Sequence, residues 1–197
     1  TKGAVDPILA VCTHAELSDG STVPLGERSE HIRARFQSLN EQGFRTLGLA
    51  FRDMGETSHI DKQHEREMTF LGLLVFADPL KPDIQETIEE LRQLGVSLKI
   101  ITGDHHLVAS YVSNRIGLDH RQVLTGQDLR QLTDEALLQR VSSINVFAEV
   151  EPNQKDRIIL ALKRSGNVVG YIGDGINDAP ALHAADVGIS VDSAVDV

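Results

Sequence analysis

The chain has 197 residues, 41% of them hydrophobic, so it can bury the core of one ordinary domain or two small ones. Its net charge of −10 disfavours a nucleic-acid partner, because neutralising phosphates takes clustered lysine and arginine. Cys12 is the one cysteine, which excludes an internal disulfide and favours a reducing compartment. No apolar run approaches the ~20 residues that a membrane-spanning helix needs, so we expect a soluble chain. Because it begins without methionine and ends in an apparently continuing segment, we also expect a piece of a longer protein.

The N-terminal part predicts a small, mixed α and β unit. An apolar segment at 8–12 followed by a polar turn, Ser18-Asp19-Gly20-Ser21, indicates a small β-rich unit at 1–27. Ile32, Phe36 and Leu39 then recur at helical spacing, and Gly43 is a typical helix stop. The remaining elements predicted here are a strand at 44–52, a charged loop at 53–68 and a strand at 69–76.

A change of pattern occurs at Asp78-Pro79-Leu80-Lys81-Pro82, where two prolines interrupt any regular element. We place a domain boundary here, with one domain at 1–77 and another at 78–197. Beyond it, helix and strand patterns alternate, which predicts an α/β fold with a parallel sheet and helices on both faces. The predicted helices are 83–94, 106–116, 128–141 and 153–164, and the predicted strands are 96–101, 145–149, 168–172 and 187–191.

The stretch from Gly173 to Leu182 carries the strongest chemical signal. A buried strand ends at Gly-Asp-Gly, and a helix resumes at Ala179 with proline in its first turn. Asp174, Asn177 and Asp178 therefore gather at the carboxyl end of a parallel strand, where open α/β sheets keep their sites. Oxygen ligands without cysteine or histidine suit a hard cation such as Mg²⁺.

Two further segments predict a phosphate site at the same edge of the sheet. Thr102-Gly103-Asp104 ends another strand and offers a hydroxyl and exposed backbone N–H groups. Lys155 lies in the first turn of a helix that Pro152 opens, where a cation is unfavourable unless an anion lies alongside. Each segment alone is more often a turn or a solvated charge, but the three together, in this order, predict phosphate and Mg²⁺ binding.

These motifs resemble the phosphorylation domain of P-type cation-transporting ATPases, a branch of the haloacid dehalogenase superfamily. The ten residues Gly173-Asp174-Gly175-Ile176-Asn177-Asp178-Ala179-Pro180-Ala181-Leu182 are the most specific part of the resemblance. Asp78-Pro79-Leu80-Lys81 is similar to the hinge of that family, and Lys2-Gly3-Ala4 to its nucleotide motif. Arg45 matches the family's nucleotide-contacting arginine, so the resemblance extends over the whole chain.

The resemblance implies a Rossmann-like phosphorylation domain at 78–197 and the C-terminal part of an α+β nucleotide-binding domain at 1–77. Asp174 and Asp178 would hold Mg²⁺. The residues implied around an aspartyl phosphate are Thr102, Gly103, Asp104, Lys155, Asn177 and Asp178. Those implied to contact ATP or its surroundings are Lys2, Gly3, Arg45, Asp78 and Lys81. The implied partners are an actuator domain and membrane helices, on the cytoplasmic side of a cell membrane, and the segment from Asp186 is similar to the magnesium-transporting subgroup.

The family's nucleophilic aspartate lies in an Asp-Lys-Thr-Gly motif, which does not occur in these 197 residues. The chain by itself is therefore expected to be inactive. In the family's topology the nucleophile strand lies between the strands that end at Thr102 and Asp174. We expect these two strands either to pair directly or to accept a strand from another molecule by self-association, since open strand edges favour pairing.

Two other functions stay open. A soluble phosphatase of the haloacid dehalogenase type shares the threonine, lysine and aspartate motifs, and a non-catalytic nucleotide- or ion-binding module needs no nucleophile. The histidines allow a further hypothesis, a metal site at His59, Asp61, His64 and Glu65 or at His105 and His106. We favour a solvated loop for the first group and a helix start for the second, because the spacing is weak evidence for ligands.

Overall fold

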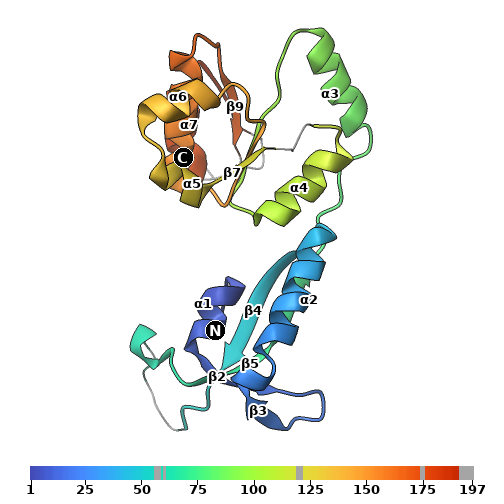
Figure 1. Cartoon of the computed structure of the whole chain (residues 1–197), viewed down its shortest axis with the longest axis vertical. Coiled ribbons are helices and arrows are strands. Elements are labelled where there is room, and N and C mark those ends of the chain that lie inside the picture. The colour runs from blue at the N-terminus through green and yellow to red at the C-terminus, as the bar shows by residue number, and fades with distance from the viewer. Residues whose placement is uncertain (56–58, 60, 119–121, 174–175, 191–197) are drawn as a thin grey trace. The chain divides into compact units, whose positions relative to one another are not determined.

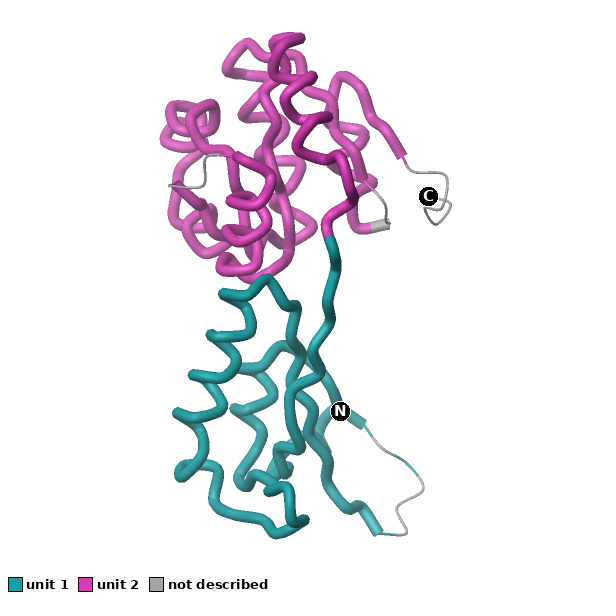
Figure 2. The backbone as a smooth tube through the Cα atoms, turned by 90° about the vertical axis from the view of Figure 1, so that its right-hand side faces the viewer, with its two compact units in different colours: residues 1–79 teal, residues 80–197 magenta. Residues whose placement is uncertain are grey.

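The structure, a computed structural model, describes residues 1–55, 59, 61–118, 122–173 and 176–190. The chain forms two compact units, residues 1–79 and 80–197 (Figure 2). Each unit has its own sheet structure and its own hydrophobic core. No helix in these described ranges is both long and apolar enough to cross a bilayer.

Unit 1 is built on a five-stranded sheet in the order β1-β4-β5-β2-β3. All neighbouring strands are antiparallel except β2 and β5, which are parallel. The elements of this unit are β1 (Lys2–Gly3), α1 (Val5–Val11), β2 (Cys12–Glu16), β3 (Thr22–Pro24), η1 (Leu25–Glu27), α2 (Ser29–Glu41), β4 (Arg45–Phe51), η2 (Lys62–His64) and β5 (Met68–Phe76). The predicted turn at 18–21, the helix and both long strands are thus confirmed.

The β-rich unit predicted at 1–27 is confirmed by strands β2 and β3, but most of its apolar segment at 8–12 belongs to helix α1. Val5, Ile8 and Leu9 are buried and recur at helical spacing, and together with Ile32 from α2 they cover one face of the sheet. Gly48 of β4 allows this contact, since a Cβ there would lie 3.0 Å from the Cβ of Ile8. Helices α1 and α2 therefore share a single core with the sheet.

Unit 2 contains two parallel sheets, one of three strands in the order β6-β8-β7 and one made by β9 and β10. Its elements are α3 (Ile84–Gln93), β6 (Ile100–Ile101), α4 (His106–Arg115), β7 (Val123–Thr125), α5 (Gly126–Gln131), α6 (Asp134–Arg140), β8 (Val146–Ala148), α7 (Pro152–Arg164), β9 (Gly170–Gly173), η3 (Ile176–Asp178), α8 (Ala179–Ala184) and β10 (Val187–Ser190). This confirms the α/β prediction.

Helices cover both faces of the three-stranded sheet, with α3 and α4 on one side and α5, α6 and α7 on the other (Figure 1). The helices on both faces bury strand β8, whose three side chains have no exposed surface. Val146 and Ala148 contact the α3 and α4 layer, whereas Phe147 points into the opposite core. Alternate residues of one strand thus fill two cores, as expected for a parallel sheet.

Of the two arrangements predicted for the strands that end at Thr102 and Asp174, direct pairing does not occur among the described residues. Strand β6 pairs with β8, strand β9 pairs with β10, and the two pairs belong to different sheets. Ile101 and Tyr171 nevertheless pack into the same core, so contacts with α7 and α8 fix the position of each strand without pairing between them. Acceptance of a strand from another molecule stays a prediction.

The boundaries differ from the sequence prediction at three places in unit 2. Strand β6 has two residues rather than six, and the helix predicted at 128–141 is two helices separated at Leu132 and Thr133. Strand β7 was not predicted, because three residues are too few to show an alternating pattern. The remaining predicted helices and strands of unit 2 are confirmed within a few residues.

A close backbone contact fixes the join between β7 and α5. A Cβ on Gly126 would lie 2.2 Å from the carbonyl oxygen of Glu149 and 2.8 Å from Oε1 of Gln154. The buried amide of Gln154 donates to the carbonyl of Gly126 at 2.9 Å, and the backbone N–H of Glu151 donates to the Gln154 Oε1 at 3.0 Å. Gly126 is therefore required for the loops after β7 and β8 to lie together.

We expect Gly126→Ala to lower the free energy of unfolding of unit 2 by about 2–3 kcal/mol, because backbone must shift to admit the methyl group. Urea unfolding followed by tyrosine fluorescence measures this in unit 2 alone, since both tyrosines of the chain lie there and it has no tryptophan. Gly170→Ala is the matched control, because its Cβ would meet the nearest atom at 3.9 Å. Equal unfolding midpoints for the two variants would contradict the prediction.

Candidate functional site

A buried ion pair lies at the carboxyl end of β9. The Lys155 ammonium donates to Asp178 Oδ1 at 2.6 Å, and the Tyr171 hydroxyl donates to the same oxygen at 2.9 Å. The side chains of Lys155 and Asp178 are only 15% and 9% exposed. Removing both charges from water is costly, and the close contact with an added hydroxyl bond offsets this cost. The two residues predicted for phosphate and Mg²⁺ chemistry are thus brought together.

The backbone at the end of β9 lies very close to the side chain of Asp178. A Cβ on Gly173 would lie 2.7 Å from the Cβ of Asp178, so glycine is required for this approach. Asp178 lies at the end of η3 and at the N-terminus of α8, whose first turn contains Pro180. Proline is suited to that turn because it lacks a backbone N–H, and an N–H there would have no acceptor within the helix. Local sequence therefore directs the Asp178 carboxylate toward the strand.

The start of α7 positions Lys155. Pro152 occupies the first turn, as the sequence predicted, and Gln154 folds back to accept from the backbone N–H of Glu151. Ile158, Ile159 and Leu162 are buried on one face and anchor the helix in the core. Lys155 is half-buried and reaches Asp178 across 23 positions of sequence. The anion expected beside this lysine is, among the described contacts, the carboxylate of Asp178.

The loop after β6 forms a second polar group. The Thr102 hydroxyl donates to Asp104 Oδ2 at 3.0 Å and accepts from the Asp104 backbone N–H at 3.1 Å. The backbone of this loop is joined to the loop after β8, because Val150 N–H donates to Thr102 and Glu149 N–H donates to Asp104. Gly103 is exposed between them. The hydroxyl is therefore oriented by its own loop.

The other predicted site residues are distributed over both units. Asp174 lies outside the described residues, so its role stays a prediction. Asn177 is exposed in η3, and Asp78 and Lys81 are exposed on either side of the boundary between the units. Among the described contacts, none joins Asp78 or Lys81 to the Lys155–Asp178 ion pair.

In unit 1, Lys2 and Arg45 project from the same face of the sheet. Lys2 lies directly opposite Leu49 on β4, and Arg45 is on the same face of that strand as Leu49. Gly3 and Gly48 belong to the other face, against Ile8. Helices α1 and α2 therefore leave the face with Lys2 and Arg45 uncovered.

Three contributors to these loops were missed from the sequence. Tyr171 was seen only as part of an apolar strand, although alternation along β9 places it on the same side as Gly173. Gln154 carries a recognisable signal, because a residue three positions after a helix N-cap commonly bonds back to the cap. Glu149 has a left-handed backbone, φ 55°, which no pattern in the sequence indicates.

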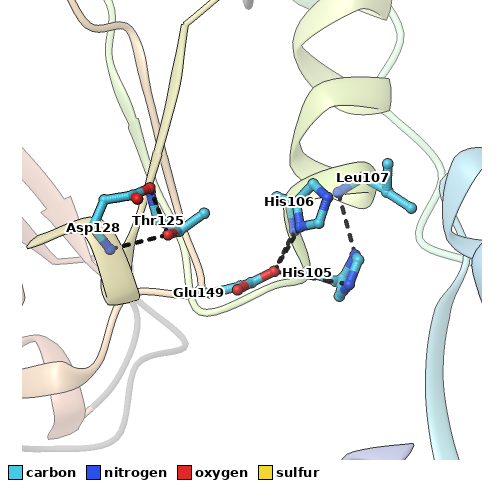
Figure 3. Close-up of polar contacts among 6 residues, drawn as sticks. All are labelled: His105, His106, Leu107, Thr125, Asp128 and Glu149. Carbon is cyan, nitrogen blue, oxygen red and sulfur yellow. Dashed lines mark hydrogen bonds and ion pairs between the residues drawn. The ribbon is translucent and has the colours of Figure 1, made fainter.

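Glu149 binds the start of α4. Its Oε1 accepts from the backbone N–H of His106 at 3.1 Å and lies 2.8 Å from His106 Nδ1 (Figure 3). Burial opposes ionisation of this carboxyl group, but the two hydrogen bonds from His106 and the nearby His105 ring outweigh it, so the pKa of Glu149 is lowered. The prediction that the two histidines start a helix is confirmed, with His105 as the N-cap of α4.

Comparison with known families agrees with this arrangement of motifs. A family profile described as haloacid dehalogenase-like hydrolase matches residues 14–186. The chain belongs to the haloacid dehalogenase-like hydrolase family. The ends of β6 and β9 and the start of α7 are the parts of this family member that carry the threonine, aspartate and lysine motifs.

Individual relatives of this haloacid dehalogenase-like chain are cation-transporting ATPases. It is 41% identical over 199 residues to the magnesium-transporting ATPase, P-type 1, of Salmonella typhimurium, and 39% identical over 198 residues to that of Escherichia coli. It is also 34% identical over 195 residues to calcium-transporting ATPase 1 of Bacillus cereus. These matches cover 97–100% of this chain and 22% of each relative, so the chain spans about a fifth of their length.

We expect Lys155→Met to destabilise unit 2 by about 3 kcal/mol, because it leaves the buried Asp178 carboxylate without its cation. Adding Asp178→Asn to this variant should recover part of the loss, since the amide keeps an oxygen for Tyr171. Urea unfolding followed by tyrosine fluorescence measures both changes.

Lys163→Met is the matched control on the same helix. Lys163 contacts Asp186 at 3.0 Å, but the two side chains are 32% and 36% exposed, so the cost should stay below about 1 kcal/mol. A loss for Lys155→Met no larger than for Lys163→Met would refute the assigned importance of the buried pair.

Proposed function

We propose that this chain is the cytoplasmic part of a P-type cation-transporting ATPase that contacts ATP and surrounds the aspartyl phosphate formed during transport. The buried Lys155–Asp178 pair at the carboxyl end of a parallel strand carries this proposal. Identity of 34–41% with such pumps over nearly the whole chain supports it. Residues 1–77 would be the C-terminal part of the nucleotide-binding domain, and 78–197 most of the phosphorylation domain.

In phosphoryl transfer, the protein acts mainly by positioning groups and stabilising charge. Lys155 would stabilise the negative oxygens of the transferring phosphoryl group, and Asp178 would hold the ammonium in place. Thr102 would transfer its hydroxyl hydrogen bond from Asp104 Oδ2 to a phosphate oxygen, and the exposed backbone of Gly103 would allow close approach. These roles use groups that the fold already orients at the ends of β6 and β9.

Mg²⁺ fits the chemistry of this edge, because its donors are carboxylate and hydroxyl oxygens. Asp174 and Asp178 would hold the ion, which would neutralise charge on the phosphate. Asp178 Oδ1 already accepts from Lys155 and Tyr171, so its carboxylate is fixed in orientation before any ion binds. Asn177, exposed beside it, would donate a hydrogen bond from its side-chain amide nitrogen to a phosphate oxygen.

The uncovered face of the unit 1 sheet suits a nucleotide. Lys2 and Arg45 provide positive charge, and Phe76, which lies directly opposite Arg45, is 47% exposed. A guanidinium can pair with phosphate while a neighbouring apolar surface contacts the base or ribose. Gly3, whose Cβ position faces Ile8 on the covered side, would contribute to the nucleotide site only through its backbone. Asp78 and Lys81 would act at the hinge between the two units.

The nucleophilic aspartate would come from another part of the parent protein, on a strand that enters between β6 and β9. Each of these strands has one neighbour in the described sheets, so each offers a free edge there. The actuator domain and the membrane helices would also belong to the parent. Magnesium would be the transported cation, because it is named in the 39–41% identical relatives. The chain would lie on the cytoplasmic side of a membrane.

Nucleotide binding gives a direct test. We expect the 197-residue chain to bind ATP, and Arg45→Ala to weaken binding by about 10-fold, the loss of one charge-assisted phosphate contact. Arg45→Lys should restore part of the affinity. Arg33→Ala is the matched control, because Arg33 is an exposed arginine of the same unit on helix α2. Isothermal titration calorimetry measures all four chains, and equal affinities would oppose the assignment of Arg45.

The phosphoryl-transfer role is tested in the full-length parent. Lys155→Ala should lower the amount of phosphoenzyme formed from labelled ATP by about 100-fold or more, because an oriented charge at the transferring group is lost. Lys163→Ala, on the same helix, should leave it unchanged. The 197-residue chain alone should not hydrolyse p-nitrophenyl phosphate. Turnover by that chain would instead favour a soluble phosphatase of the same family.

A further inference from the structure

A cluster of three metal-binding side chains lies beside the candidate phosphate loop. His105, His106 and Glu149, here called the histidine–glutamate cluster, each offer a ligand atom, and these atoms all lie within 4.8 Å of one another. Their side chains are 31%, 45% and 37% exposed, so an ion from solvent can reach them. No function described above uses any of the three side chains.

Two loops hold the cluster together. The backbone N–H of Glu149 donates to the Asp104 carbonyl at 2.9 Å, which joins the end of β8 to the residue before His105. The backbone N–H of His106 donates to Glu149 Oε1, and His105 caps α4 through its Nδ1, which accepts from Leu107 N–H (Figure 3). The three side chains are therefore close together before any ion is present.

Backbone strain at Glu149 is a separate observation. Its φ of 55° lies in the left-handed region, which a residue with a long side chain rarely adopts. Strained residues of this kind cluster at ligand sites, where the surrounding structure holds them in place. Here the strain aims the carboxylate at the start of α4, because Glu149 reaches both histidines: Oε1 lies 2.8 Å from His106 Nδ1 and 3.8 Å from His105 Nε2.

We propose that the histidine–glutamate cluster binds a divalent transition metal ion such as Zn²⁺, with two imidazoles and one carboxylate as ligands and solvent in the fourth position. Two nitrogen ligands and one oxygen ligand favour Zn²⁺ over Mg²⁺, because Mg²⁺ prefers oxygen ligands. Ligand atoms around tetrahedral zinc are about 3.3 Å apart, so no distance within the cluster needs to shorten by more than about 1.5 Å. Rotation of partly exposed side chains permits this.

Binding requires two local rearrangements. The ring nitrogen of His106 exchanges its hydrogen bond with Glu149 for a bond to the metal, and the carboxylate becomes a ligand. His105 uses Nε2, for which its Nδ1 must carry the proton and release the 3.3 Å bond from Leu107 N–H. Both lost bonds involve partly exposed groups, which water can also satisfy.

This site is distinct from the proposed Mg²⁺ site. It uses none of the residues Asp174, Asn177 or Asp178, and its nitrogen donors suit a softer ion. Because it does not depend on ATP or on the nucleophile, failure of the proposed function would leave it standing. An ion here would link the end of β8 to the start of α4. The start of α4 comes directly after Thr102-Gly103-Asp104 in the chain.

Titration of the 197-residue chain with Zn²⁺ and Co²⁺ tests the proposal. We expect one equivalent of Zn²⁺ by calorimetry, a tetrahedral Co²⁺ absorption band, and no displacement by excess Mg²⁺. His106→Asn and Glu149→Gln should each weaken Zn²⁺ binding at least about 10-fold, since each removes one of three ligands. His183→Asn, which changes an exposed histidine in α8, is the matched control and should bind as the unmodified chain does.

Histidine-ring NMR of the unmodified chain keeps the test independent of variant folding. Zn²⁺ should shift the ring nitrogen signals of His105 and His106 and leave those of His14, His31 and His183 unchanged. Absence of saturable Zn²⁺ binding would overturn the proposal. So would Zn²⁺ binding that persists in His106→Asn and Glu149→Gln, or ring shifts confined to other histidines.

Discussion

Complete burial of β8 is the constraint on which unit 2 depends. Val146, Phe147 and Ala148 have no exposed surface, so this strand needs a neighbour on each edge and helices on each face. Burying a strand in this way removes water from its backbone groups, which must then find partners in the sheet. The pairing of β6 and β7 with β8 meets that requirement. The positions of the loops after β6 and β7 follow from where β8 ends.

The residues after β8 determine how the loops meet. Val150 and Glu149 donate backbone N–H groups to Thr102 and Asp104, and the carbonyl of Glu149 lies against Gly126. One strand end therefore joins the loop after β6 to the loop after β7. The left-handed backbone of Glu149 is tolerated because these contacts fix the residue on both sides. The candidate phosphate loop and the histidine–glutamate cluster share this support.

Sequence patterns located the elements well where they were long and periodic, and poorly where tertiary contacts decide. Helices α2 and α7 have apolar faces at helical spacing, and both were predicted. Helix α1 was missed because its seven residues are mostly apolar and its helical form depends on packing against Gly48. The motifs located Lys155 and Asp178, but the bond between them depends on how α7 and α8 lie together, which spacing does not specify.

The Lys155–Asp178 pair also resolves a conflict between two helix starts. A lysine in the first turn of α7 faces the positive end of that helix, which is unfavourable, whereas an aspartate at the start of α8 is favourable. Contact between the two side chains offsets the unfavourable position of Lys155 with the negative charge of Asp178. An ammonium has three donors, and among the described residues Asp178 is its one acceptor. The pair thus holds the Lys155 side chain in a largely dry position with donors remaining for an anion, as the proposed phosphoryl transfer would require.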